Sequence, residues 1–181
     1  LALYRNSPEQ FAANTKPVDL LALSQDVVAR LYPEFEKKNQ QIELESDARL
    51  DHGDFTIDGE AFALETLLTN LLVNASRYTP LGGQIIVALS REDERVFLAV
   101  EDDGIGIPLA DRKRIFDRFT RLANTDTEGR AGCGLGLAIV GHVAGLHHAV
   151  VNVMSSRFSS GTAFIVEFQS AKAFSAGESD E

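Results

Sequence analysis

The fold is decided by Asn70-Leu71-Leu72-Val73-Asn74-Ala75-Ser76-Arg77-Tyr78-Thr79-Pro80. Wound as an α-helix at about 100° per residue, this stretch gathers four polar side chains on one face: Asn70, Asn74, Arg77 and Tyr78. The apolar positions face a sheet: Leu67, Leu68, Leu71, Leu72 and Ala75. Carboxamides suit a hydrated magnesium ion, a guanidinium suits phosphate oxygens, and a tyrosine ring can cover a base. The helix predicts one wall of a nucleotide site; taken alone, its residues also fit an amphipathic helix with a solvated polar side.

Length and composition bound the class of protein. The 181 residues, of which 44% are apolar, suffice for one well-buried core, and we expect one domain with ragged ends. No apolar run approaches the roughly 18 residues of a membrane span, and no signal peptide is recognisable. The chain starts at Leu1 and its only methionine is Met154, which indicates a piece of a longer protein. One cysteine excludes an internal disulfide, four scattered histidines disfavour a zinc site, and a cytoplasmic setting fits best.

The net charge argues against nucleic acid as a partner. At -10 the chain lacks the excess of lysine and arginine that neutralises phosphates. Segment 108–131 is nevertheless locally basic, with four acids against six cations: Arg112, Lys113, Arg114, Arg118, Arg121 and Arg130. Such a segment can meet a small polyanion, and it can equally be a solvated loop.

Periodicity predicts an α/β domain. Helical spacing of apolar residues predicts three helices: Asp19–Lys38, Glu60–Tyr78 and Leu135–Leu146. Alternation and turn residues predict six strands: Gln41–Glu45, Phe55–Ile57, Gln84–Arg91, Arg95–Asp102, Ala149–Met154 and Thr162–Phe168. Asp51–Asp54 is expected as a turn, and segment 103–133 as a long irregular loop with a short helical pattern at Asp111–Phe119. Loops of this length inside a compact domain are usually functional.

Two glycine motifs follow the opening helix. Val100-Glu101-Asp102-Asp103-Gly104-Ile105-Gly106-Ile107-Pro108 places a carboxylate at a strand end, where it could accept a hydrogen bond from an exocyclic amine such as that of adenine. The alternative is a strand that simply ends in a glycine turn. Gly132-Cys133-Gly134-Leu135-Gly136-Leu137-Ala138-Ile139-Val140 opens a helix, whose first peptide N–H groups can bind phosphate. Neither motif has the form of a P-loop or a dinucleotide-binding fold.

The order of these motifs resembles the catalytic ATP-binding domain of sensor histidine kinases. The asparagine helix, the DxGxG strand end, Ile115-Phe116-Asp117-Arg118-Phe119 and GxGLGL are similar to that family's N, G1, F and G2 boxes, over about residues 19–168. The resemblance implies a Bergerat fold, an α/β two-layer sandwich whose mixed, mainly antiparallel sheet is covered on one face by three helices. Residues 1–17 would be a lead-in from a missing dimerisation and phosphoacceptor helix, 18–169 the catalytic domain, and 170–181 a disordered acidic tail.

The same resemblance implies roles for individual residues. Asn74 would ligate Mg²⁺, Asn70 would support the ion or hold phosphate, and Arg77 would take phosphate oxygens. Tyr78 would flank adenine and Asp102 would receive its amine. The remaining residues predicted to bind nucleotide are Gly104, Gly106 and Ile107 at the floor, Gly132, Gly134, Leu135 and Gly136 at the phosphates, and Thr162 at the base through water.

Segment 108–131 would be an ATP lid. Phe116 and Phe119 would anchor it to the core, and Arg118 and Arg121 are candidates for contacts with the γ-phosphate or a partner, although surface salt bridges explain both arginines as well. The chain departs from the family at three places: His147-His148-Ala149 replaces His-Gly-Gly, Ser159 replaces a glycine, and Ala131 stands where a G2 glycine often lies. None of these removes a predicted ligand.

The resemblance favours a kinase over its alternatives. In relatives that hydrolyse ATP, a glutamate one turn before the magnesium asparagine positions water; here Asn70 stands there, and an amide is no general base. Glu65 lies on the opposite side of the helix. The alternatives are a hydrolytic ATPase and a non-catalytic binding module. No helix before Asn70 carries a histidine followed by an acid, so we expect the chain to bind ATP and Mg²⁺ without phosphorylating itself. Because the resemblance assigns dimerisation to helices that are missing, we expect the fragment to be a monomer. Its implied partners are its own dimerisation domain and a response regulator, within a membrane-anchored homodimer.

Overall fold

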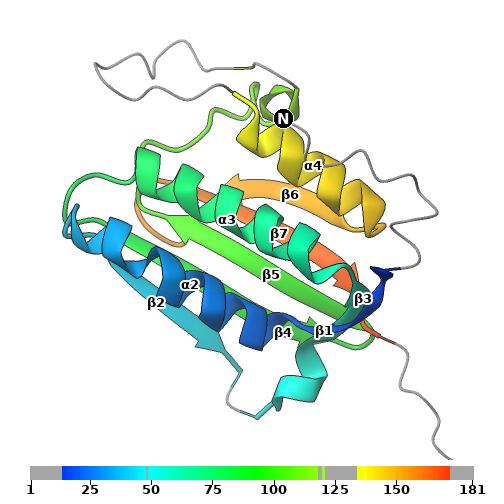
Figure 1. The fold of residues 1–181 in the computed structure, drawn as a ribbon. Coiled ribbons are helices and arrows are strands. Elements are labelled where there is room, and N and C mark those ends of the chain that lie inside the picture. The colour runs from blue at the N-terminus through cyan, green and yellow to red at the C-terminus, as the bar shows by residue number, and fades with distance from the viewer. Residues whose placement is uncertain (1–13, 48, 118–119, 121–133, 172–181) are drawn as a thin grey trace, which may run out of the picture.

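The computed structural model describes residues 14–47, 49–117, 120 and 134–171 (Figure 1). Its helices are α2 (Leu20–Glu36), α3 (Ala61–Tyr78) and α4 (Gly136–Leu146), with short 3₁₀ helices η1 (His52–Phe55) and η2 (Arg114–Phe116). Its strands are β1 (Lys16–Asp19), β2 (Gln41–Ser46), β3 (Thr56–Gly59), β4 (Gln84–Glu92), β5 (Arg95–Asp102), β6 (Val150–Ser155) and β7 (Thr162–Gln169).

The main sheet has five strands in the order β2-β4-β5-β7-β6. Strands β2 and β4 are parallel and the other neighbours are antiparallel, while β1 and β3 form a separate antiparallel pair. Helices α2, α3 and α4 all lie on one face of the sheet (Figure 1). The predicted fold class is therefore confirmed, because the sheet is mixed, mainly antiparallel and covered on one face by three helices.

Helix α3 forms the centre of the core. Its apolar side is buried against the sheet, as the sequence predicted, at Leu67, Leu68, Leu71, Leu72 and Ala75. Burying each of these leucines contributes roughly 1.5–3 kcal/mol, so the apolar side fixes the rotation of the helix. The opposite side of α3 consequently carries its amides, arginine and tyrosine away from the core. Glu60 caps the start of α3, because its carboxylate accepts the N–H groups of Phe62 and Ala63.

The end of α3 is held by a buried glutamine. The side-chain amide of Gln40, in the connection between α2 and β2, donates to the carbonyls of Ser76, Thr79 and Pro80 at 3.0, 2.9 and 3.3 Å. The hydroxyl of Ser76 donates back to Oε1 of Gln40 at 2.8 Å. Carbonyls at a helix end have no partner within the helix, so these bonds stabilise the turn that follows Tyr78.

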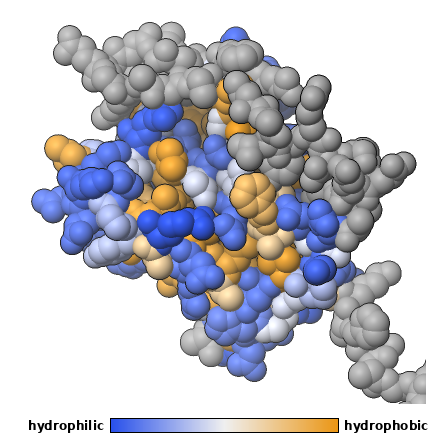
Figure 2. All heavy atoms as spheres, viewed as in Figure 1, coloured by the Kyte–Doolittle hydropathy of each residue, from blue (hydrophilic) through white to orange (hydrophobic). Residues whose placement is uncertain are grey.

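The outer surface of the helices is mixed. Figure 2 shows this face as hydrophilic areas around hydrophobic patches. The large apolar side chains that α2 and α3 expose are Tyr32, Phe62 and Val73. No helix among the described residues is both long and apolar enough to cross a membrane.

The shortest helices and strands of the structure differ from those that the sequence predicted. Strand β1 was not predicted, and it starts at Lys16, inside the expected lead-in. The turn expected at Asp51–Asp54 is the 3₁₀ helix η1, and of the helical pattern at Asp111–Phe119 the described residues form only η2. Four-residue elements show too few periods to reveal themselves in a sequence. Ser170 and Ala171 still donate backbone hydrogen bonds, and residues 172–181 lie outside the description.

Candidate nucleotide site

The predicted base end of the site is built around Asp102, the last residue of β5. Its side chain is on the helix-covered face and the residue is only 3% exposed. The backbone N–H groups of Gly104 and Thr162 both donate to Oδ1, at 2.9 and 3.3 Å. Because both bonds end on the same oxygen, Oδ2 is left to accept a donor from a ligand. The structure thus brings the first glycine motif and Thr162 together, and the role of Thr162 at the base stays a prediction.

The environment of Asp102 disfavours its charge. Burial raises the pKa of Asp102 to about 6, and the nearby Asp103 carboxylate adds to that rise. The N–H groups of Gly104 and Thr162 act in the opposite direction because they stabilise the carboxylate. A carboxylate kept inside the protein at this cost is typical of a functional position rather than of a surface turn.

The pH dependence of stability should report this carboxyl group. Its raised pKa means that folding favours the protonated form, so its contribution to stability is fully present below its ordinary value of 3.8 and is lost as pH rises through about 6. At neutral pH the loss amounts to roughly 3 kcal/mol at most. We expect urea unfolding to show that Asp102→Asn gains stability over the native chain as pH rises from 4 to 7. A difference that stays constant over this range would contradict the assignment.

Close backbone approaches surround Asp102. At Gly104 a Cβ atom would lie 2.6 Å from the carbonyl oxygen of Tyr78, so the first glycine motif packs directly on the end of α3. Gly106 has a φ of +73°, and a Cβ there would lie 3.2 Å from the carbonyl oxygen of Gly161. Gly161 itself has a φ of +110°, and its Cβ would lie 1.8 Å from the carbonyl oxygen of Asp102. Sequence reasoning did not single out Gly161, although its place just before Thr162 was a usable signal.

The predicted phosphate end lies where α3 meets the start of α4. Nδ2 of Asn70 donates to the carbonyl of Thr66 at 2.8 Å, one turn earlier in α3. A Cβ at Gly136 would lie 2.9 Å from Oδ1 of Asn70, so this oxygen faces the first residue of α4. Gly134 has a left-handed φ of +66°, and Leu135 is the N-cap of α4, which begins at Gly136. The structure therefore brings the asparagine helix next to Gly136, the described end of the second glycine motif.

Helix α3 links the two ends. From Asn70 to Tyr78 it rises about 12 Å, so a ligand with its base beside Asp102 and its phosphates beside α4 would run along this face. The side chains of Asn74, Arg77 and Tyr78 are half-buried there, and no hydrogen bond to another described residue occupies them. Ile107 is partly buried and packs against the core.

A magnesium ion suits the donors at this position. Among the described residues no group of three or more His, Cys, Asp or Glu side chains could hold a metal ion. Mg²⁺ usually keeps several waters and binds one or two protein oxygens together with substrate phosphates. Oδ1 of Asn70 is oriented toward α4 by the Thr66 bond, and Asn74 lies one turn further along the same face. This donor set fits an ion that arrives with a phosphate ligand.

The start of the predicted lid is anchored to the core. Ile115 is buried, and the ring of Phe116 meets that of Phe164 edge to face, with centroids 6.5 Å apart. Arg112, expected as one cation of a basic segment, instead donates to the carbonyls of Ile107 and Val153 at 3.1 and 3.2 Å. It therefore ties this segment to β6. The other predicted positions in this part of the chain lie outside the described residues: Arg118, Phe119, Arg121, Ala131, Gly132 and Cys133.

The first of the two histidines after α4, His147, has a structural role. Nδ1 of His147 bonds the Val143 carbonyl at 2.8 Å, and its Nε2 accepts the N–H of Glu60 at 3.1 Å. Burial lowers the pKa of His147, so the ring is held in its neutral form. His148 adopts a left-handed φ of 52° at the position where a glycine was expected from the resemblance. The turn thus forms without glycine, at a modest strain.

Glu65 cannot take part in the site. Arg30 of α2 donates to its carboxylate at 3.0 Å, on the side of α3 that faces α2. The carboxylate is thereby directed away from Asn70 and Asn74. The only predicted position for a water-activating acid on this helix is therefore filled by the Asn70 amide.

Comparison with known proteins gives a consistent picture. The profile of the family described as histidine kinase-, DNA gyrase B-, and HSP90-like ATPase matches residues 59–172. The sensor-like histidine kinase SenX3 of Mycobacterium tuberculosis is 38% identical over 117 residues, which are 65% of this chain and 28% of SenX3. The chain thus spans less than a third of that relative.

Solved structures agree in fold and sequence. The mycobacterial sensor histidine kinase MprB superposes with a TM-score of 0.73 at 26% identity, over 86% of this chain and 97% of the MprB chain. Full-length ShkA, in complex with AMPPNP, superposes with a TM-score of 0.72 at 30% identity, over 88% of this chain and 32% of ShkA.

Proposed function

Because the chain belongs to the family of histidine kinase-, DNA gyrase B- and HSP90-like ATPases, and its relatives are sensor histidine kinases, we propose that it binds ATP with Mg²⁺ and supplies the γ-phosphate to a histidine on a separate domain. The observation that carries this proposal is the buried Asp102 carboxylate, with two backbone donors on Oδ1 and with Oδ2 free for a base amine. The ShkA neighbour is described with an ATP analogue bound, which supports the same class of ligand.

The residues of α3 and α4 would divide the work at the phosphates. Asn74 would hold Mg²⁺ and Asn70 would support it, Arg77 would neutralise phosphate oxygens, and backbone N–H groups at Gly134 to Gly136 would bind others. When bound, Mg²⁺ supplies positive charge that neutralises the phosphate oxygens and so reduces their repulsion of the attacking nucleophile. The protein's own contribution is then to position the nucleotide and to stabilise its charge.

The orientation of Asn70 supports transfer to a histidine over hydrolysis. Its Nδ2 is occupied by the Thr66 carbonyl, and its Oδ1 faces Gly136. A neutral amide in this arrangement cannot take a proton from water, and Glu65 is held by Arg30 on another side. The nucleophile would be an imidazole nitrogen of the phosphoacceptor histidine, which bonds to the γ-phosphorus as ADP leaves. The wider setting belongs to the same proposal: the chain would be the cytoplasmic catalytic domain of a membrane-anchored homodimer that phosphorylates a response regulator.

Nucleotide binding is tested by thermal unfolding with ATP or GTP, each with and without Mg²⁺. At a hundredfold excess over the dissociation constant, a ligand stabilises the folded state by about 2.7 kcal/mol, so a shift of several degrees is expected with ATP and Mg²⁺. GTP should shift it little, because its base presents a carbonyl where adenine presents an amine. Asn74→Ala should lose the part of the shift that depends on Mg²⁺ and keep the rest. A chain that responds to no nucleotide is a non-catalytic module, and the proposed function fails.

The fate of the γ-phosphate is tested separately. With labelled ATP, we expect neither label on the chain nor steady release of phosphate, because the acceptor histidine and a general base are both missing from the described site. Label should appear on a phosphoacceptor domain of a sensor kinase added in trans. Steady turnover of ATP by the chain alone would indicate a hydrolytic ATPase instead.

A further inference from the structure

The turn between β6 and β7, residues 156–161, contacts the end of β5 through hydrogen bonds and close backbone packing. The hydroxyl of Ser160 donates to the carbonyl of Asp103 at 3.2 Å. The backbone of Gly161 packs on the carbonyl of Asp102, and the N–H of Thr162 binds the Asp102 carboxylate. The position of Asp102 therefore depends on the position of this turn. Within the turn, the hydroxyl of Ser156 bonds the Ser160 carbonyl at 2.9 Å.

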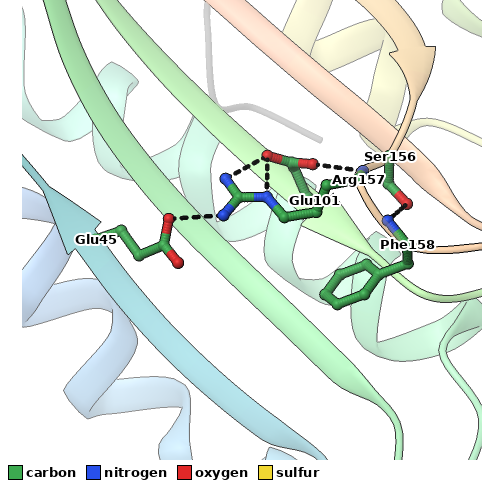
Figure 3. Close-up of polar contacts among 5 residues, drawn as sticks. All are labelled: Glu45, Glu101, Ser156, Arg157 and Phe158. Atoms are coloured by element: carbon green, nitrogen blue, oxygen red, sulfur yellow. Dashed lines mark hydrogen bonds and ion pairs between the residues drawn. The ribbon is translucent and has the colours of Figure 1, made fainter.

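One arginine attaches the turn to the sheet. Arg157 lies between two carboxylates, Glu101 on β5 and Glu45 on β2 (Figure 3). Its Nε and Nη2 donate to Oε1 of Glu101 at 3.1 and 2.8 Å, and its backbone N–H donates to Oε2 of the same carboxylate at 3.0 Å. Its Nη1 donates to Oε2 of Glu45 at 2.8 Å. The guanidinium thus bridges across β4, which lies between β2 and β5.

These contacts exceed an ordinary surface ion pair. Most exposed pairs contribute little to stability, since two mobile side chains must be ordered in water. Here one carboxylate takes three donors from a single residue, and the Glu101 side chain is only 12% exposed. Nε and Nη2 converge on Oε1 of Glu101 while the backbone N–H of Arg157 donates to Oε2, so one residue holds both oxygens of this carboxylate. Arg157 is therefore suited to hold the turn in one place.

The contact between Arg157 and Glu101 affects the neighbouring residue of β5, Asp102. Glu101 and Asp102 are consecutive in β5, so their side chains point to opposite faces of the sheet. Arg157 holds Glu101 on the face without helices, while Thr162 holds Asp102 on the face with them. The turn is covalently continuous between these two contacts. Moving Arg157 would therefore shift the N–H donor on which the Asp102 carboxylate depends.

We propose that Arg157 is a positioning residue for recognition of the nucleotide base, acting through Glu101 and the β6–β7 turn without touching the ligand. The proposal rests on the proposed function, because it assigns the Asp102 end of the site to a base. The proposed role of Arg157 is limited to the base end of the site and does not extend to the phosphate end. Among the described residues, the side-chain hydrogen bonds of Arg157 end on β2 and β5, and none reaches Asn70 or the start of α4.

The test compares Arg157→Met with Arg95→Met. Arg95 forms a similar pair with Glu167 at 2.9 Å, at the opposite end of β5 and distant from the site, so it controls for the loss of a surface arginine. We expect Arg157→Met to raise the dissociation constant for ATP with Mg²⁺ by about tenfold, equivalent to one hydrogen bond at Asp102. Its affinity for inorganic triphosphate with Mg²⁺ should stay within about twofold of the native value, because the phosphate end is independent. The dissociation constant of Arg157→Lys for ATP should lie between those of the native chain and Arg157→Met.

Amide hydrogen exchange tests the positioning role of Arg157 in the ligand-free protein. Amide hydrogen exchange should accelerate in Arg157→Met at Gly104 and Thr162, the two donors to Asp102, and remain unchanged in Arg95→Met. Unchanged ATP affinity, or equal losses for ATP and triphosphate, would overturn the positioning role while leaving the proposed function intact. A native chain that binds no ATP would overturn both, whereas faster exchange throughout the chain would show that Arg157 serves only the general stability of the fold.

Discussion

Asp102→Asn is expected to abolish most of the stabilisation by ATP while leaving the ligand-free protein as stable as before or more so. In the native chain Oδ1 accepts two backbone N–H groups, and Oδ2 is the proposed acceptor for the base amine. An asparagine has only one side-chain oxygen. If it faces Gly104 and Thr162, the amide nitrogen faces the adenine amine, and if it is turned the other way, it opposes the backbone donors. In both orientations two N–H donors face each other without an acceptor between them. Such a mismatch at a buried site lowers the affinity for ATP about a hundredfold or more.

The opposite effect on the empty protein makes this result specific. Removing a buried charge whose pKa is raised to about 6 should stabilise the ligand-free fold at neutral pH, by roughly 3 kcal/mol at most. Loss of binding would then not reflect loss of structure. Asp103→Asn removes the same charge from the neighbouring residue and should keep ATP binding. The measurements are calorimetric titration with ATP and urea unfolding without it, and native-like affinity in Asp102→Asn would show that the base is bound elsewhere.

Gly161→Ala is expected to lower the free energy of unfolding by roughly 3 kcal/mol or more, which is exceptional for the addition of one methyl group. Two causes act together. The φ of +110° lies where side chains are strained, and the new Cβ would lie 1.8 Å from the Asp102 carbonyl oxygen. The turn must therefore move away from β5. Because Thr162 follows directly, ATP affinity should fall as well.

Two other glycines separate these causes. Gly82 has a φ of +75° with nothing within 4 Å of its Cβ position, so Gly82→Ala should cost only the backbone strain, about 1 kcal/mol. Gly145 lies in α4 with equally open space and no positive φ, so Gly145→Ala should stabilise by about 0.5–1 kcal/mol. Urea unfolding of the three variants should rank them in this order. A Gly161→Ala variant no worse than Gly82→Ala would mean that the turn does not press on Asp102.

The sequence predicted the architecture well because its signals are local. The three long helices and the strands of the main sheet each span several periods of alternation, and their bounds in the structure differ by a few residues at most. Helix α2 starts within one residue of the predicted position, where the Asp19 carboxylate caps it by accepting the N–H groups of Leu21 and Ala22. Strand β1 escaped prediction because four residues, one of them Pro17, show no pattern of their own.

The candidate site could be predicted in part. Motif order placed Asn70, Asp102 and Gly136 in one site, and the structure brings α3 next to both glycine motifs. The magnesium role of Asn74 and the phosphate role of Arg77 stay predictions. The contacts of Arg157 gave no local signal, because Glu101 and Glu45 lie 56 and 112 residues away in the chain.

The sequence by itself determined which face of the Asn70–Pro80 helix is polar and which chemical groups it offers. Periodicity fixes this, since burying the leucines leaves the amides only one direction. Only the tertiary structure decided that Asp102 is buried, that its two donors come from Gly104 and Thr162, and that Gly161 and Arg157 hold them in place. Burial and hydrogen-bond partners depend on which distant strands become neighbours, and strand order is a property of the packed chain rather than of any segment of it.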